Sequence, residues 1–310
     1  MSSPPRQTAS FLMQRFREVG LEPDKRRGQN FLIDLNLLEI LADAADLSER
    51  DVVLEVGTGL GSLTALMAPH AGHVITVEID KHLQQLAMEV LHPFDNVTLL
   101  GQDVLKNKNN LHPTVLETIH SELGKSPDRQ LKLAANLPYC VATPIISNLL
   151  STPVTPVSMT VTIQKELADR ISGRPNTKDY NALSIWFQCQ CRTETLRVLP
   201  PSVFWPRPKV DSAIVQIVPD PEMRSRIPDL AFFHSFVRAM FFHRRKFLRS
   251  VLLSAMKDRL SKPEADEILT AQQLGPDARA EQLDVDRMLA LCEAVRQQVE
   301  PQHPPTPCEG

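Results

Sequence analysis

The sequence predicts an α/β protein with a doubly wound parallel sheet and a smaller, all-helical C-terminal domain. Short apolar runs alternate with amphipathic segments between residues 35 and 164, which is the pattern of repeated β-α units. A glycine-rich turn follows the first apolar run, as in nucleotide-binding sheets. Beyond residue 226 the apolar spacing is helical throughout, which predicts the second domain.

The first elements along the chain are predicted to be helices. In residues 10–19 the apolar side chains have helical spacing, and Gly20 would end the helix. A loop follows, and residues 35–47 read as an amphipathic helix. We treat residues 1–27 as an N-terminal extension that carries one helix.

The sheet is predicted from five short apolar runs, which suit buried parallel strands. They are residues 51–57, 73–80, 96–103, 131–139 and 157–164. The amphipathic segments between them predict helices within 58–71, at 81–91 and at 143–150. The resulting Rossmann-like domain is expected to cover residues 28–219.

The C-terminal part begins after a polar, proline-rich segment, PDPEMRSRIPDL, which predicts a linker. The helical domain is expected to cover residues 226–300, with residues 231–257 as its first helical stretch. The tail, residues 301–310, has the composition of a disordered segment.

The composition is that of a soluble globular protein. The chain has 310 residues, of which 42% are hydrophobic and 23% charged, enough for two domains. No stretch approaches the roughly 18 consecutive apolar residues of a membrane span. The N-terminal residues lack the apolar core of a secretory signal. We therefore expect a cytoplasmic protein.

The charge and the cysteines give weaker indications. The net charge of −3 argues mildly against a nucleic-acid-binding protein, but residues 236–253 hold five Lys or Arg and no Asp or Glu. The five cysteines are odd in number and irregularly spaced, which argues against a disulfide framework. Cys189 and Cys191 are expected to fill apolar space. A metal site at this C-x-C pair is the alternative, and we predict no metal centre.

Polar and glycine residues follow three successive predicted strands. Gly57, Gly59 and Gly61 permit a tight turn to which a ligand can come close. Glu78 lies 21 residues after Gly57, where a carboxylate can accept hydrogen bonds from ribose hydroxyls. Asp103 could accept from an adenine amino group, with a helix N-cap as the alternative. Together these residues predict a nucleotide cofactor site at the carboxyl ends of the strands.

The identity of the cofactor depends on two further residues. The glycine turn and Glu78 suit a dinucleotide as well as S-adenosylmethionine. Glu55 precedes the first glycine and gives E-x-G-x-G-x-G, the usual form in methyltransferases, and Asp103 adds the adenine contact. The sequence therefore favours S-adenosylmethionine as the methyl donor.

The fourth predicted strand ends in Asn136-Leu137-Pro138-Tyr139. The exocyclic amine of adenine is a poor nucleophile because its lone pair is delocalised. The Asn136 side-chain oxygen and the Leu137 carbonyl could accept hydrogen bonds from its two N–H groups, while Pro138 stiffens the turn. Tyr139 offers a stacking face for an extruded base, and Phe204 is expected to provide the opposite face. The alternative for the NLPY turn is an ordinary strand end, and the alternative for Phe204 is an aromatic residue of the hydrophobic core.

These motifs, taken in order, resemble the KsgA family of ribosomal RNA adenine dimethyltransferases. The resemblance rests on GQNFL, EVGTGLG, NLPY, QKE and PRPKVDS between Gly28 and Val218, and on FFHRRKFLRSVL in the helical domain. Thr58 stands where many members have Pro, and Cys140 stands where relatives often carry other residues. Neither departure removes an assigned contact. A nucleophilic Cys140 is disfavoured because no basic residue lies near it in sequence.

The resemblance implies a substrate, a partner and site residues. It implies methylation at N6 of two adjacent adenosines in the 3′-terminal hairpin of small-subunit (16S) rRNA, and binding to an assembling small subunit. We expect a monomer that binds neither DNA nor membranes. The candidate cofactor-binding residues are Asn30, Leu32, Gly57, Gly59, Glu78, Asp103 and Asn136. The candidate catalytic residues, which hold the target base, are Asn136, Leu137, Pro138, Tyr139 and Phe204. Residues 29–32 would form a lid; the alternative is that Phe31 and Leu32 only anchor the next helix.

Four basic residues in the helical domain are candidate RNA contacts: Arg244, Arg245, Lys246 and Arg249. On a continuous helix, Arg245 and Arg249 would share one face. Phosphate contacts of this kind would position the substrate without reading its sequence. The alternative is a solvated helix face.

Three other functions remain open. A large-subunit rRNA methyltransferase of the antibiotic-resistance type would usually have a more basic helical domain and would lack the PRPKVDS match. A non-catalytic assembly or transcription factor is disfavoured by the intact Asn136, Tyr139 and Glu78. A nicotinamide-dependent oxidoreductase would find no proton donor for its chemistry in the NLPY turn.

Charge reversal at Arg244 and Arg245 is expected to weaken binding to the small ribosomal subunit and to leave S-adenosylmethionine binding unchanged, because phosphate contacts are electrostatic. Subunit affinity measured at several salt concentrations checks this. An unchanged affinity at moderate salt would contradict the phosphate role.

Overall fold

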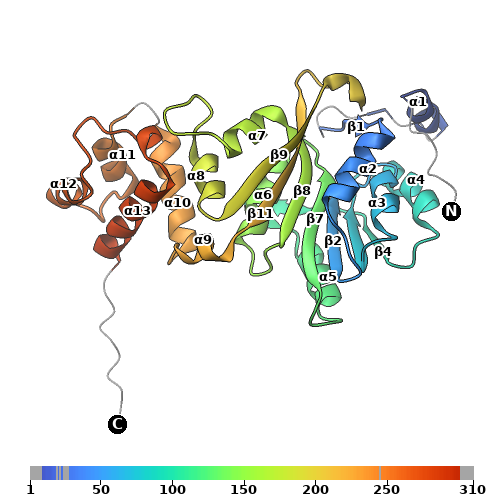
Figure 1. Cartoon of the computed structure of the whole chain (residues 1–310), viewed down its shortest axis with the longest axis horizontal. Coiled ribbons are helices and arrows are strands. Elements are labelled where there is room, and N and C mark those ends of the chain that lie inside the picture. The colour runs from blue at the N-terminus through green and yellow to red at the C-terminus, as the bar shows by residue number, and fades with distance from the viewer. Residues whose placement is uncertain (1–8, 19, 21, 24–27, 244–245, 301–310) are drawn as a thin grey trace, which may run out of the picture. The chain divides into compact units, whose positions relative to one another are not determined.

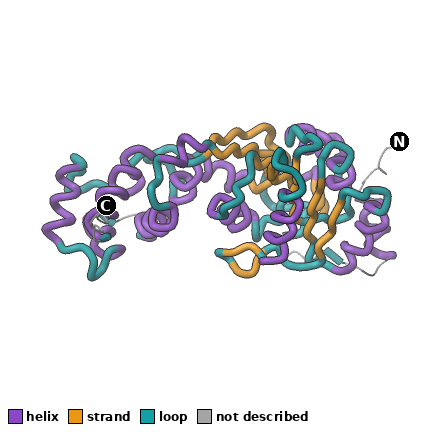
Figure 2. The backbone as a smooth tube through the Cα atoms, turned by 90° about the horizontal axis from the view of Figure 1, so that it is seen from below, coloured by secondary structure: helices purple, strands orange, loops and turns teal. Residues whose placement is uncertain are grey.

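The computed structural model describes residues 9–18, 20, 22–23, 28–243 and 246–300. The chain forms two compact units (Figure 1). The first comprises the chain up to Ala168 together with Thr193–Pro219, and the second comprises Asp169–Arg192 together with the chain from Asp220 onward. In Figure 2 the strands gather in the first unit, whereas the described part of the second consists mainly of helices and loops.

A seven-stranded sheet forms the centre of the first unit, with the strand order β4-β3-β2-β7-β8-β11-β9. Neighbouring strands from β4 to β8 run parallel, and β11 is antiparallel to β8. The strands are β2 (Asp51–Val56), β3 (His73–Val77), β4 (Val97–Leu100), β7 (Gln130–Asn136), β8 (Ser158–Gln164), β9 (Cys191–Leu199) and β11 (Ser212–Pro219). The chain proceeds outward from β2 to β4 and then returns to β7 on the other side of β2. A doubly wound sheet binds ligands at this reversal, beyond the carboxyl ends of the strands.

Helices cover the sheet. Along one face α2, α3 and α4 pack in sequence, and α5 packs against β2, β3 and β7. The helices of this unit are α1 (Ala9–Glu18), α2 (Leu35–Ala44), α3 (Ser62–Met67), α4 (Lys81–Leu91), α5 (Pro113–Leu123) and α6 (Ala142–Ser151). The short α7 (Lys165–Ile171) begins in the first unit and ends in the second.

Two short strand pairs complete the first unit. β1 (Phe31–Leu32) pairs antiparallel with β10 (Phe204–Trp205), which follows a short 3₁₀ helix, η2 (Pro201–Val203). β5 (Leu105–Asn107) pairs with β6 (Asn110–Leu111). The first pair joins the predicted lid segment to the loop that carries Phe204.

The second unit is built around a buried aromatic core. Tyr180 is fully buried and its hydroxyl donates to the Leu283 carbonyl at 2.6 Å, while Trp186 stacks against Phe233 at 6.4 Å. The elements of this unit are α8 (Ala182–Gln188), α9 (Pro221–Ser225), α10 (Leu230–Phe242), α11 (Leu248–Ala255), α12 (Lys262–Ala271), η3 (Ala280–Gln282) and α13 (Val285–Val299).

The predicted fold class is confirmed, and the five predicted strands correspond to β2, β3, β4, β7 and β8. The structure differs from the predicted domain limits, because residues 169–192 belong to the second unit and not to a domain spanning 28–219. Burial explains this difference, since Tyr180 and Trp186 contribute their side chains to the core of the helical unit. The predicted linker after β11 also contains a helix, α9, whose N-cap is Asp220.

The structure contradicts the prediction of one continuous helix through the basic segment of residues 236–253. α10 ends at Phe242 and α11 begins only at Leu248, after an extended N-cap at Phe247. The Leu248 backbone N–H donates to the Ala278 carbonyl at 2.7 Å. In a continuous helix, this N–H would instead donate to the carbonyl four residues earlier in the chain. The prediction of one helix face shared by Arg245 and Arg249 loses its premise of a continuous helix, and Arg245 itself lies outside the described residues.

The predicted RNA contacts have different outcomes. Arg244 and Arg245 lie outside the described residues. Lys246 is exposed. Arg249 forms a two-pronged ion pair with Asp266, at 2.5 Å from Nε and 2.7 Å from the terminal nitrogen, so a phosphate would have to compete with this carboxylate.

A buried ion pair supports the amino end of the central strands. Lys132 of β7 is 7% exposed, and its Nζ lies 3.2 Å from the fully buried carboxylate of Asp51. Nζ also donates to the carbonyls of Ala45 and Asp46. Burial alone would raise the pKa of Asp51, but hydrogen bonds from Gln130, Ser48 and Lys132 lower it below its ordinary value.

Lys132→Met is expected to destabilise the protein by about 3–5 kcal/mol, because it leaves the Asp51 carboxylate buried without its cation. Urea unfolding followed by circular dichroism measures the loss. The double variant Lys132→Met, Asp51→Asn removes both charges and is expected to be more stable than the single variant. Equal stability of the two variants would contradict this explanation.

Candidate functional site

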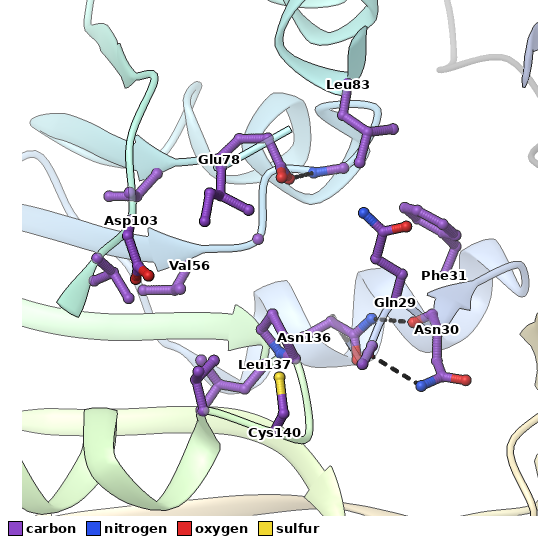
Figure 3. Close-up of a pocket in the computed structure, with 18 of the residues that line it drawn as sticks. Gln29, Asn30, Phe31, Val56, Glu78, Leu83, Asp103, Asn136, Leu137 and Cys140 are labelled. Atoms are coloured by element: carbon purple, nitrogen blue, oxygen red, sulfur yellow. Dashed lines mark hydrogen bonds between the residues drawn. The ribbon is translucent and has the colours of Figure 1, made fainter. Parts of the chain in front are cut away.

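A cavity of about 250 Å³ opens at the carboxyl ends of the parallel strands (Figure 3). It lies in the first unit, where the strand order reverses between β2 and β7. Eight of the residues proposed from sequence line it: Asn30, Gly57, Gly59, Glu78, Asp103, Asn136, Leu137 and Pro138. They come from segments up to 108 residues apart in the chain, and the sheet brings them together at one edge.

The glycine turn wraps one wall of this cavity. Gly57 has φ +88°, a conformation that favours glycine, and a Cβ there would come within 3.3 Å of the Pro138 ring. The Gly59 backbone N–H donates to Oε2 of Glu78 at 3.0 Å, and Oε1 of Glu78 accepts from the Asp80 backbone at 3.0 Å. Burial is the largest influence on Glu78 and raises its pKa. The carboxylate is thus held at the end of β3 and faces the cavity.

Behind the glycine turn lies a second, fully buried carboxylate. Glu55 is 1% exposed, and Oε2 accepts hydrogen bonds from Thr64 at 2.5 Å and from Thr76 at 2.7 Å. The Thr76 hydroxyl lies 2.6 Å from that of Thr58, within the glycine turn. These hydroxyls tie the turn to β3 from behind. Burial, and to a smaller degree the charge of Glu78, raises the pKa of Glu55 to about 7.

The NLPY turn forms the opposite wall. Nδ2 of Asn136 donates to the Asn30 carbonyl at 3.0 Å, which fixes the orientation of the planar amide. Within the described part of the chain, Oδ1 of Asn136 is buried and has no hydrogen-bond partner. The Pro138 carbonyl accepts from the backbone N–H groups of Val141 and Ala142, which begins α6 and fixes the turn. This wall therefore contains a buried acceptor that has no donor among the described residues.

The predicted lid segment lies across both walls. A Cβ on Gly28 would come within 3.1 Å of the Tyr139 backbone nitrogen, so glycine permits the close approach to the NLPY turn. Asn30 donates to the Gly28 carbonyl at 3.1 Å. The Phe31 ring lies 3.4 Å from the position of a Cβ on Gly59. Gln29, Asn30 and Phe31 all line the cavity, as Figure 3 shows.

Three predicted site residues do not line the cavity. Leu32 and Phe204 are only 3% and 2% exposed and belong to one hydrophobic cluster, facing each other across β1 and β10. Neighbouring residues of a strand point to opposite sides, so Phe31 meets the cavity and Leu32 the core. A stacking role for Phe204 would require its ring to leave this cluster. Tyr139 is half-buried, and its hydroxyl bonds the Ser212 hydroxyl.

Several cavity residues were not predicted. Val56, Val77, Ile79 and Leu83 supply apolar surface around the predicted carboxylates. Val56, Val77 and Ile79 are sequence neighbours of Gly57 and Glu78, so the sequence could have predicted them as cavity residues. Leu83 could not be predicted in this way, because it lines the cavity only through the packing of α4 beside the glycine turn. Gln102 and Cys140 also line the cavity. Burial is the largest influence on the Cys140 thiol and raises its pKa, which disfavours a reactive thiolate.

Asp103 does not cap a helix, since the strand β5 follows it, so the N-cap alternative is wrong and the adenine contact stays a prediction. Asp103 lines the cavity, and its Oδ1 accepts from the Leu105 backbone at 2.9 Å in a local turn.

Among the described residues, no group of three or more His, Cys, Asp or Glu side chains could hold a metal ion. Within the same residues, none of the helices has the length and apolar character needed to cross a membrane.

Glu55→Gln is expected to flatten the pH dependence of folding stability. The pKa of Glu55 rises from 4.5 to about 7 on folding, so stability falls as pH rises from about 4.5 to 7 and stays lower above that range. The effect is about 3 kcal/mol. Unfolding of both proteins at pH 5 and pH 8 tests this, and equal pH slopes in the two proteins would contradict it.

Comparisons with known proteins identify the family and the fold of this chain. The ribosomal RNA small subunit methyltransferase A of Lactiplantibacillus plantarum is 41% identical over 280 residues, which cover 90% of this chain and 92% of that protein. The protein of the same name from Halothermothrix orenii is 38% identical over 275 residues, 89% of each chain. Among solved structures, a dimethyladenosine transferase from Plasmodium falciparum has a TM-score of 0.69 at 23% identity and covers 83% of this chain and 94% of its own.

A second solved structure with the same fold is the 23S rRNA methyltransferase ErmE, with a TM-score of 0.60 at 24% identity over 86% of this chain and all of its own. The family described as Ribosomal RNA adenine dimethylase matches residues 22–297, which include the cavity and most of the helical unit. The chain belongs to the ribosomal RNA adenine dimethylase family.

Proposed function

We propose that this protein transfers methyl groups from S-adenosylmethionine to N6 of adenosines in small-subunit rRNA. Membership of the adenine dimethylase family and the names of the relatives, which are 37–42% identical, support the reaction class and the substrate. The observation that carries the proposal is the unpartnered acceptor oxygen of Asn136 at the wall of the cavity.

The chemistry follows from that acceptor. An unpaired buried oxygen costs free energy, which a donor from the substrate can recover. The Asn136 amide is already held by Asn30, so the orientation of its oxygen is set before the target amine donates an N–H to it, and only the groups that cover the oxygen have to yield. An amide does not take up the proton, so the nitrogen is oriented and hydrogen-bonded for attack on the methyl carbon, and its N–H proton leaves to water after the transfer. Tyr139, next to Pro138, is proposed to stack on the base.

The cavity residues fit S-adenosylmethionine, which when bound supplies a methyl group on a positively charged sulfur. The glycine turn allows a ligand close to the backbone at Gly57 and Gly59. Glu78 and Asp103 offer carboxylate oxygens for ribose hydroxyls and for an adenine amino group. Their negative charges also suit a cationic ligand. Phe31 and Leu83 provide apolar surface beside them.

The finer parts of the proposal extend to substrate, partner and location. We propose that the two adjacent adenosines of the 3′-terminal hairpin are each dimethylated, within an assembling small subunit. The exposed Lys246 and the neighbouring Arg244 and Arg245 would contact phosphates of this RNA. We further propose that the protein acts as a monomer in the cytoplasm.

The decisive experiment incubates the protein with isotopically labelled S-adenosylmethionine and undermethylated small ribosomal subunits, and then maps the modified nucleotides. Label at N6 of two adjacent adenosines near the 3′ end of the small-subunit RNA supports the proposal. Label in large-subunit RNA, or binding of the subunit without any transfer, would overturn it.

Asn136→Ala is expected to lower the rate of methyl transfer by about 10²–10³-fold, because the amine loses its oriented acceptor. Single-turnover transfer to the small subunit measures the loss, and filter binding shows whether the subunit is still held. Asn148→Ala, at a half-buried position on α6 that does not line the cavity and whose side chain donates to the Lys108 carbonyl, is the matched control. A rate for Asn136→Ala close to that of the control would contradict the role of Asn136.

A further inference from the structure

Helix α1 carries an apolar face that reaches the cavity walls from behind. Leu12 and Phe16, four residues apart on one side of the helix, are 0% and 2% exposed. They share a hydrophobic cluster with Leu60, Leu83 and Leu86, and Phe31 and Trp205 pack against it. Leu60 lies within the glycine turn, and Leu83 and Phe31 line the cavity itself. One helix thus contacts a cluster built from several walls of the site.

The aromatic contacts concentrate on the lid. The Phe16 ring meets the Phe31 ring edge-to-face with centroids 5.2 Å apart, and meets Trp205 at 5.3 Å. Phe31 and Trp205 also pair across β1 and β10, with stacked rings 6.5 Å apart. The Phe31 ring in turn lies against the glycine turn at Gly59. Phe16 therefore closes a chain of contacts that holds Phe31 in place.

An ion pair fastens α1 to the neighbouring helix. Arg15 bonds Glu89 of α4, and it also bonds Glu18 within α1 at 2.7 Å. These hydrogen bonds and charges raise the pKa of Arg15, although burial opposes the shift. The helix α1 is thus held by the ion pairs of Arg15 and by the apolar contacts of Leu12 and Phe16. These two kinds of contact together fix how the helix is rotated about its axis.

We propose that α1 is a positioning element of the methyl-donor site, in which Phe16 holds Phe31 against the glycine turn. This inference rests on the proposed function and extends it to residues that precede the family match, which begins at residue 22. Phe16 does not line the cavity, so it acts through Phe31 and touches no ligand. Without the Phe16 ring, Phe31 loses one of its two aromatic neighbours, and Trp205, the other neighbour, loses its own contact with Phe16. Donor binding must then order the lid segment.

The test compares Phe16→Ala with Met13→Ala, an exposed apolar residue of the same helix that is 38% exposed. Isothermal titration with S-adenosylmethionine is expected to show about tenfold weaker binding for Phe16→Ala and no change for Met13→Ala. Phe16→Leu, which refills most of the space, is expected to recover part of the affinity. Binding of the small subunit in the absence of the donor is expected to be unchanged.

A second measurement reports on the lid directly. The chain has two tryptophans, so Trp186→Phe leaves Trp205 as the only one. Its emission is expected to change when S-adenosylmethionine binds, and Phe16→Ala in this background is expected to reduce that change. This readout needs only that the variant folds, which circular dichroism establishes. Should Phe16→Ala not fold, Arg15→Gln loosens α1 from α4 instead and is expected to weaken donor binding about twofold.

The outcomes separate the two proposals. A lower melting temperature of Phe16→Ala with unchanged donor affinity and unchanged Trp205 response would show that α1 only stabilises the fold and would overturn the inference. Absence of S-adenosylmethionine binding in the unaltered protein would instead overturn the proposed function, and the inference with it.

Discussion

The site depends on the close approach of three chain segments that glycine makes possible. The lid comes near the NLPY turn at Gly28, the glycine turn meets the Pro138 ring at Gly57, and Phe31 covers Gly59. A Cβ at Gly28 or Gly57 would crowd the neighbouring segment, and all three glycines have a positive φ that other residues rarely adopt. The Asn136 amide lies at their junction, fixed by the Asn30 carbonyl, and its free oxygen is a consequence of that fixation. Orientation of one acceptor is therefore a property of three segments and not of the NLPY turn alone.

Buried polar groups stabilise this arrangement, although burying their ionised forms costs free energy. Glu55 and Glu78 place two carboxylates within one small region, and burial makes ionisation of both unfavourable. The threonine hydroxyls around Glu55 and the backbone donors around Glu78 partly offset that cost. Burial and the nearby charge of Glu78 raise the pKa of Glu55 to about 7, which lowers the cost of holding two carboxyl groups so close together. The inner carboxyl group of Glu55 supports the glycine turn, whereas Glu78 and Asp103 line the cavity.

The sequence predicted the sheet and most of the cavity because both depend on local patterns. Apolar runs identified β2, β3 and β7, and the polar residues after them mark the ends of strands that must meet at one edge. Leu32 and Phe204 were assigned from motif membership, but their orientation is set by a two-residue strand pair that has no periodicity to read. The interruption at Phe247 contains no glycine or proline, and it is imposed by the contact of Leu248 with Ala278. Tertiary contacts also decide that residues 169–192 join the helical unit.

The division of the chain has a consequence for how the protein can be dissected. The backbone passes between the two units at three places, after residues 168, 192 and 219. A truncation at Pro219 would remove α10 and α13 but leave α8 behind, with Trp186 stripped of Phe233 and Tyr180 of the Leu283 carbonyl. An excised catalytic fragment would thus carry an uncovered aromatic surface and tend to aggregate. Exchange of the helical unit between relatives requires two inserts and three junctions, because no single cut separates it from the sheet.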